Sequence, residues 1–174
     1  ETAVSASPSF AMRWLVPRLD DFRIVHPELD VRIAATDRLV DPRREAIDLC
    51  IRYGEGDYPG LTVTPLITDE VFPVCSPRLA GLSSPEDLRS HRLLHDEMFP
   101  DHPARPGWRQ WAKLAGVDLT GIPSARFSHA SMAIEAAIAG QGVALGRSSL
   151  VARDLSEGRP VSYTHLTLPT KCWV

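Results

Sequence analysis

The beginning of the chain alternates between strand-like and helix-like patterns, and this alternation leaves few folds open. The patterns predict strands at residues 3–7, 29–33 and 47–53 and helices at 8–26 and 41–46. Pro17 lies inside the first helix, where a proline should cause a kink. Successive strand–helix–strand units predict a parallel sheet with right-handed crossovers.

The remainder of the chain continues the pattern. Residues 61–74 are rich in β-forming side chains, enough for one long strand or two. Ser84 with Asp87 predicts a capped helix start, and Gly116 should end a helix that carries two tryptophans. Further expected elements are strands at 126–128 and 143–145 and helices at 131–139 and 150–155, with a largely irregular stretch at 95–107. We therefore expect an α/β fold with mostly parallel sheets flanked by helices.

Charge and cysteine content narrow the possible partners and the compartment. The formal net charge is -3, and the longest basic cluster, Arg43-Arg44, is followed at once by an acidic residue, so direct binding of nucleic acid is disfavoured. The sequence contains no apolar run long enough to span a membrane and no secretory signal pattern at its start. Three widely spaced cysteines, Cys50, Cys75 and Cys172, argue against a disulfide framework. A cytoplasmic protein is expected.

Four blocks of sequence carry a resemblance to a known family. They read SPSFAMRWLVPRLDDFRIVHPELDVRI (7–33), VDPRREAIDLCIRYGEGDYPGL (40–61), DEVFPVCSP (69–77) and AAIAGQGVALGRSSLVARDLSEGRPV (136–161). Together they closely resemble the effector-binding domain of LysR-type transcription regulators. The most similar branch contains the glycine-cleavage activators and the β-lactamase-inducing regulators.

The resemblance implies a two-lobed fold like that of type-2 periplasmic binding proteins, with a small-molecule effector held between lobes at residues 1–72 and 73–160. In the family the chain then returns to complete the first lobe, so this lobe should be incomplete at the C-terminus and lack apolar cover. The resemblance also implies a homodimer or tetramer that pairs helices 15–25 and 132–139. Promoter DNA would be bound only through an absent N-terminal winged helix-turn-helix, and no cofactor is implied.

The last residues, 161–174, follow no periodic pattern and read VSYTHLTLPTKCWV. Residues 161–170 resemble the in-frame translation of a transposase-type sequencing-library adapter. We expect a non-native tail in which Tyr163, His165, Cys172 and Trp173 carry no function. An ordinary strand followed by a tail is the alternative.

Candidate ligand-binding residues follow the expected strands, because parallel α/β sheets bind ligands at the carboxyl ends of their strands. Ser7 and Ser9 lie at the end of the first strand and at a helix N-terminus, where backbone N–H groups attract an anion such as an effector carboxylate. Helix capping alone is the alternative. Thr36 and Asp37 follow the second strand, and Asp37 could hold an effector amine or cap the next turn.

Arg52 and Tyr53 end the third expected strand. Arg52 could clamp a carboxylate through paired hydrogen bonds or form a surface salt bridge. The second lobe contributes strand-end candidates by the same argument: His95, Asp96, Ser128 and His129. Together they suggest a carboxylate or amino-acid-like effector.

Three other functions are alternatives to effector sensing by a transcription regulator. A metal site could use His91, His95, Asp96 and His102, although the proline-rich stretch makes a tetrahedral arrangement accidental. An enzyme is disfavoured because the sequence holds no nucleophile elbow, P-loop or dinucleotide-binding glycine motif. A secreted solute-binding protein of the same fold is disfavoured by the missing signal pattern and the unpaired cysteines.

Overall fold

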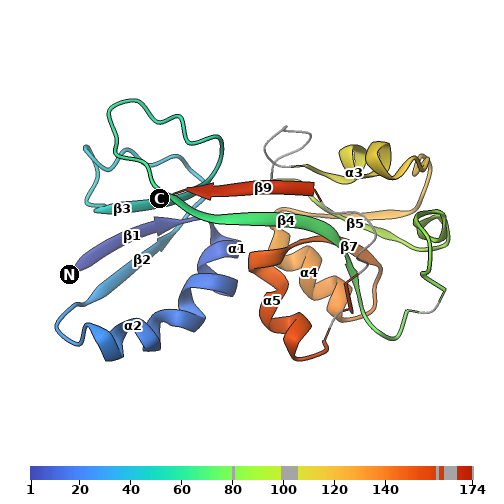
Figure 1. The fold of residues 1–174 in the computed structure, drawn as a ribbon, viewed down its shortest axis with the longest axis horizontal. Coiled ribbons are helices and arrows are strands. Elements are labelled where there is room, and N and C mark those ends of the chain that lie inside the picture. Colours follow the sequence, from blue (N-terminus) through green and yellow to red (C-terminus); the bar gives the residue numbers. More distant parts are fainter. Residues whose placement is uncertain (80, 99–105, 160, 163–167, 174) are drawn as a thin grey trace. The chain divides into compact units, whose positions relative to one another are not determined.

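The computed structural model describes residues 1–79, 81–98, 106–159, 161–162 and 168–173, the last two ranges as backbone only (Figure 1). The chain forms two compact units. Unit 1 comprises Glu1–Thr68 with Lys171–Val174, and unit 2 comprises Asp69–Thr170. The chain leaves unit 1 within a strand, a few residues before the boundary expected after Phe72.

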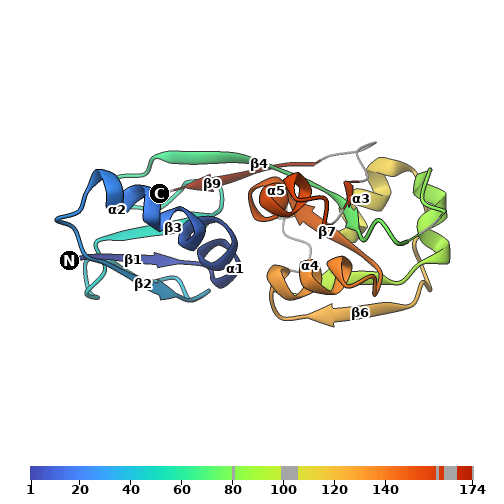
Figure 2. The same cartoon turned by 90° about the horizontal axis from the view of Figure 1, so that it is seen from below.

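Unit 1 is built on a parallel sheet, as the alternation predicted. Its strands are β1 (Thr2–Ala6), β2 (Val31–Ala35) and β3 (Leu49–Tyr53), with β9 (Leu168–Trp173) alongside β3 in the antiparallel direction. β1 is central and pairs in parallel with both β2 and β3 (Figure 2). Its last residue, Ala6, is in register with Ala35 and Ile51, so the carboxyl ends of the three strands lie at one edge.

A helical run follows β1 and is irregular around its proline, as expected. Its parts are α1 (Pro8–Phe10), the π-helical η1 (Ala11–Leu15), the 3-10 helix η2 (Val16–Arg18) and α2 (Leu19–Val25). Pro17 has no N–H to continue the α-helical ladder, and the hydrogen bonding changes type on either side of it. The buried Phe10 ring stacks on Trp14 and meets Tyr53 edge-on, with centroid distances of 4.9 and 6.0 Å. These rings seat the start of the run against β3.

The prediction of a short helix at residues 41–46 is wrong. The segment is a hydrogen-bonded turn in which the Arg44 and Glu45 N–H groups both donate to the Asp41 carbonyl. The Asp41 carboxylate is drawn to Arg43, with an Nε–Oδ1 distance of 2.9 Å. One turn with little apolar face lacks the packing that stabilises short helices.

Unit 2 is a mixed sheet with helices around it. Its strands are β4 (Pro65–Cys75), which begins in unit 1, β5 (Leu93–Asp96), β6 (Ser124–Phe127), β7 (Val143–Arg147) and β8 (Val161–Ser162). Its helices are η3 (Pro85–Ser90), α3 (Trp108–Ala115), α4 (Ala130–Ile138) and α5 (Ser148–Ser156). β5 pairs in parallel with β6 and β7, whereas β4 and β8 add antiparallel pairs.

The two units differ in how many large apolar side chains they leave exposed. In unit 2 the side chain of Trp111 is fully buried among Leu88, Leu93 and Val143. Unit 1 instead exposes large apolar side chains, among them Ile24 at 78% and Leu39 at 67%. Leu114 and Met132 of unit 2 are exposed as well, at 51% and 48%, and incomplete apolar cover of the first lobe stays a prediction. Among the helices of the described residues, none is long and apolar enough to cross a membrane.

Candidate functional site

The sheet of unit 1 brings two of the predicted residues together at its edge. Ser7 directly follows β1 and Thr36 directly follows β2, and the Thr36 N–H donates to the Ala6 carbonyl at 2.9 Å. The Ser7 hydroxyl makes no hydrogen bond that caps the helical run. The backbone carbonyl of Ser7 accepts the Ala11 N–H at 2.9 Å. Capping therefore does not explain why a serine stands at this position.

Ser9 and Asp37 lie one step beyond these residues. Ser9 is buried within α1, and Asp37 is half-buried in the loop that leaves β2. The Thr36 hydroxyl oxygen accepts the Arg38 N–H at 3.2 Å, so this loop is ordered from its first residue. The edge thus combines two hydroxyl residues on one segment with a hydroxyl and a carboxylate on the next.

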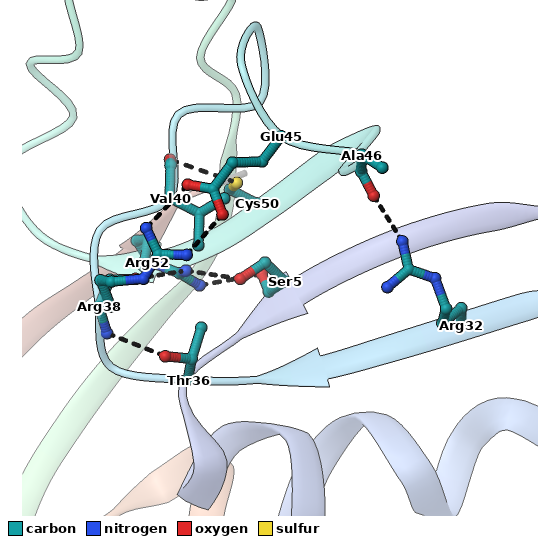
Figure 3. A network of polar contacts seen from close by, with 9 residues as sticks. All are labelled: Ser5, Arg32, Thr36, Arg38, Val40, Glu45, Ala46, Cys50 and Arg52. Carbon is teal, nitrogen blue, oxygen red and sulfur yellow. Dashed lines mark hydrogen bonds and ion pairs between the residues drawn. The ribbon is translucent and has the colours of Figure 1, made fainter.

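Arg52 lies near the end of β3, as predicted, and its side chain is buried in unit 1. Arg52 is 7% exposed, and its guanidinium donates hydrogen bonds to neutral oxygens of the protein (Figure 3). Nη1 donates to the carbonyls of Ser5 at 2.9 Å and Ile51 at 2.8 Å. Nη2 donates to the Ser5 hydroxyl at 2.7 Å and to the Arg38 carbonyl at 3.2 Å. The fork that would clamp an effector carboxylate is already used inside unit 1.

Tyr53 belongs to the core of unit 1. It is 4% exposed and packs on Phe10, on the face of β3 opposite that of Arg52, because consecutive strand residues point to opposite faces. Arg52 and Tyr53 therefore cannot line the same side of a site. In this arrangement Tyr53 positions the helical run.

In unit 2, His95 and Asp96 line a cavity of about 320 Å³. Burial lowers the pKa of His95, and the positive charge of Arg126 lowers it further, so the imidazole is held neutral more strongly than a free histidine. Asp96 accepts the Met98 N–H at 3.0 Å, which shapes the turn after β5. A neutral imidazole beside a carboxylate offers both donor and acceptor groups to a polar ligand.

Ser128 and His129 follow β6 and make a local pair. The Ser128 hydroxyl lies 2.8 Å from Nδ1 of His129, and the His129 carbonyl accepts the Met132 N–H at the start of α4. The Glu97 N–H donates to the Phe127 carbonyl at 2.8 Å, joining the ends of β5 and β6. The predicted unit 2 residues thus gather at one edge of this sheet, although Ser128 and His129 are not among the residues that line the cavity.

Sequence reasoning missed three arginines that line the same cavity: Arg109, Arg126 and Arg147. Arg126 pairs with Glu97 at an Nη1–Oε1 distance of 3.2 Å. Arg147 is the last residue of β7. It was not predicted as a strand-end residue because the expected strand ended at residue 145. These cations together with Asp96 and Glu97 suit a ligand that carries both signs of charge.

A second cavity, of about 350 Å³, lies in unit 1 and is mostly apolar. Its lining includes Leu39, Leu49, Leu61, Cys50 and Arg52.

Burial raises the pKa of the Cys50 thiol and of the Cys75 thiol, which disfavours the reactive thiolate in both. Both cysteines are free, as expected of small apolar residues.

The metal alternative gains no support from the described residues. No group of three or more histidine, cysteine, aspartate or glutamate side chains gathers there in a way that could hold an ion. His102, one of the four residues considered for it, lies outside the described part of the chain.

Residues 1–169 match the profile of the LysR substrate binding domain. The chain is 41% identical over 163 residues to the glycine cleavage system transcriptional activator of Escherichia coli K12, covering 91% of this chain and 52% of that protein. It is 34% identical over 157 residues to the transcriptional activator AmpR of Pseudomonas aeruginosa, covering 88% and 51%. The chain spans about half the length of the curated relatives it matches.

Solved structures of effector domains also superpose on this chain. The effector domain of Pseudomonas aeruginosa AmpR superposes with a TM-score of 0.80 at 31% identity, covering 99% of this chain and 82% of that one. The effector-binding domain of Citrobacter freundii AmpR superposes with a TM-score of 0.81 at 26% identity, covering 99% and 86%. The expected fold class, an α/β fold like that of the periplasmic binding proteins, is therefore confirmed.

Proposed function

Because this chain belongs to the LysR substrate-binding domain family, we propose that it is the effector-sensing domain of a DNA-binding transcription regulator. Its relatives are transcription regulators and not enzymes. The parent regulator acts in the cytoplasm and contacts promoter DNA through an N-terminal winged helix-turn-helix. The net charge of -3 supports the assignment of DNA binding to another domain, because phosphate binding favours a basic protein surface.

One observation carries the proposal of effector binding. The Thr36–Ala6 hydrogen bond places Ser7 and Thr36 on adjoining segments at the strand ends, where ligands of parallel α/β sheets bind. Ser9 and Asp37 extend this edge, and His95, Asp96, Ser128 and His129 form the corresponding edge of unit 2. Hydroxyls and backbone N–H groups suit an effector carboxylate, and Asp37 suits an amine. The effector is accordingly a carboxylate or an amino-acid-like compound.

Oligomer formation is supported by apolar residues that remain exposed on two helices. Val25 and Ile24 on α2 are 70% and 78% exposed, and Met132 on α4 is 48% exposed. We infer that α2 of one copy packs against α4 of another, giving a side-by-side homodimer that can assemble further into a tetramer. Effector binding then biases two arrangements of the dimer and passes the change to the DNA-binding domains.

A solute-binding protein of the same fold is the second candidate. Fold alone does not separate the two, because related folds serve different functions. The identity to transcriptional activators along most of the chain favours the regulator.

The assignment is tested by DNA binding of the full-length protein and of this chain. We expect the full-length protein to retard the DNA upstream of its own gene in a gel mobility assay. This chain alone should leave the same DNA unshifted at micromolar concentration. Retardation by this chain, or failure of the full-length protein to bind any promoter fragment upstream of its gene or of neighbouring genes, would contradict the proposal.

A further inference from the structure

The buried Arg52 contacts the loop that follows β2. This loop carries Thr36 and Asp37, two of the residues proposed to bind the effector at the strand ends of unit 1. The loop leaves β2 at Thr36 and Asp37, and its next residue, Arg38, is held by its backbone carbonyl. That carbonyl accepts a hydrogen bond from Nη2 of Arg52 at 3.2 Å, across fourteen residues of sequence (Figure 3). The same nitrogen donates to the Ser5 hydroxyl, so Arg52 joins the loop to the central strand β1.

The loop is fastened from its other side as well. The Arg38 guanidinium makes a two-bond contact with the Glu45 carboxylate, with Nη–Oε distances of 2.8 and 2.5 Å. This contact lowers the pKa of Glu45, since hydrogen bonding favours the charged carboxylate. Arg32 donates to the Ala46 carbonyl at 2.5 Å (Figure 3). These anchors are exposed, whereas Arg52 is buried, and exposed ion pairs contribute little to stability.

The electrostatics of Arg52 tie it to the effector edge. Burial lowers its pKa, while the nearby Cys50, Tyr58 and Asp37 raise it. Its guanidinium donates to neutral oxygens of Ser5, Ile51 and Arg38. The negative charge of Asp37 favours the charged form of the guanidinium. Its Nε has no hydrogen-bond partner. A buried, multiply bonded guanidinium of this kind is rigid, and rigid support keeps binding groups in their productive geometry.

We propose that Arg52 is a positioning residue of the effector site: from inside unit 1 it fixes the loop so that Thr36 and Asp37 face the strand-end edge. This inference rests on the proposed function, and it replaces the role of a carboxylate clamp that the sequence suggested. This role does not require contact between Arg52 and the effector. Arg52 acts through its hydrogen bond to the Arg38 carbonyl.

The first readout of the test requires no ligand. Amide hydrogen exchange is measured on wild-type chain and on the Arg52→Lys and Arg52→Met variants, the first of which keeps the buried charge if the second fails to fold. We expect the amides of residues 37–47 to exchange about tenfold faster in both variants, while the amides of unit 2 keep their rates. Arg44→Lys, in the same loop with an 86% exposed side chain, is the matched control and should leave all rates unchanged.

The second readout separates positioning from a merely structural role. Glycine, the smallest molecule with both a carboxylate and an amine, is titrated while the Ser7 and Thr36 amide resonances are followed. We expect Arg52→Lys to weaken glycine binding about tenfold and to reduce the loss caused by Asp37→Asn, because Asp37 is then already displaced.

The outcomes are distinguishable. Unchanged loop exchange in both Arg52 variants, or faster exchange with unaltered glycine affinity, would overturn the positioning role. If wild-type chain does not bind glycine, glycine is excluded as an effector, and the exchange rates still decide whether Arg52 holds the loop.

Discussion

Replacing Trp111 with alanine is expected to lower the free energy of unfolding of unit 2 by about 3–5 kcal/mol. The side chain is fully buried and meets Trp108 edge-on at a centroid distance of 5.6 Å. Trp111 packs in one cluster with Leu93 of β5 and Val143 of β7, and its removal leaves a cavity that a tightly packed core fills only in part. Thermal unfolding followed by circular dichroism measures the loss.

Two further variants make this prediction specific. Leu114→Ala lies on the same helix at a position 51% exposed, and its effect should stay within about 0.5 kcal/mol. Trp111→Phe keeps an aromatic ring in the core and should cost clearly less than the alanine variant. A Trp111→Ala protein that melts like the Leu114→Ala control would show that α3 does not form the core of unit 2 in the way described.

The second large effect is expected at Asp69, which is fully buried in β4. Its carboxylate accepts the Ser149 N–H at 2.7 Å and the hydroxyls of Ser148 and Ser149, so it binds the N-terminus of α5. Asp69→Ala leaves these donors without their acceptor in a buried place and removes a negative charge from a helix N-terminus. We expect a loss of about 3 kcal/mol in the free energy of unfolding.

The neighbouring residue provides the control for Asp69. The exposed Glu70 contacts α5 through its backbone, because its N–H donates to the Ser148 hydroxyl at 3.1 Å. Glu70→Ala should therefore leave the melting temperature almost unchanged, and Asp69→Asn, which keeps one acceptor oxygen, should fall between the two. Equal stability of Asp69→Ala and Glu70→Ala would refute the anchoring role.

The sequence predicted the elements whose signal is local. Period-two and period-3.6 patterns identified the parallel strands of unit 1, and Gly116, with φ of 69°, ends α3 in the left-handed conformation expected of a helix-ending glycine. The capping box of Ser84 and Asp87 was also confirmed, although it opens a 3-10 helix and not an α-helix. These features depend on residues close together in the chain.

Contacts between distant residues could not be predicted in this way. The partners of Asp69 lie 79 and 80 residues away, and the Arg38 carbonyl that Arg52 binds lies in a loop with no periodic pattern. The strand alternation already implied that Arg52 and Tyr53 point to opposite faces, so assigning both to one site was an error the sequence itself could have prevented. The ligand-binding roles of the other strand-end residues, the domain bounds and the non-native tail stay predictions. The family profile extends to residue 169, into that tail.

We propose that the strand-end edge of unit 1, with Ser7 and Ser9, senses a small molecule. The most direct measurement uses the full-length regulator with Ser7→Ala and Ser9→Ala, its promoter fragment, and a panel of amino acids, dicarboxylates and dipeptides. For the compound that most alters the wild-type footprint, we predict a response weakened by about a hundredfold in the double variant, with DNA affinity unchanged and an exposed-site control, Ser124→Ala, like wild type. A double variant that responds to the same compound at wild-type concentrations would contradict the account.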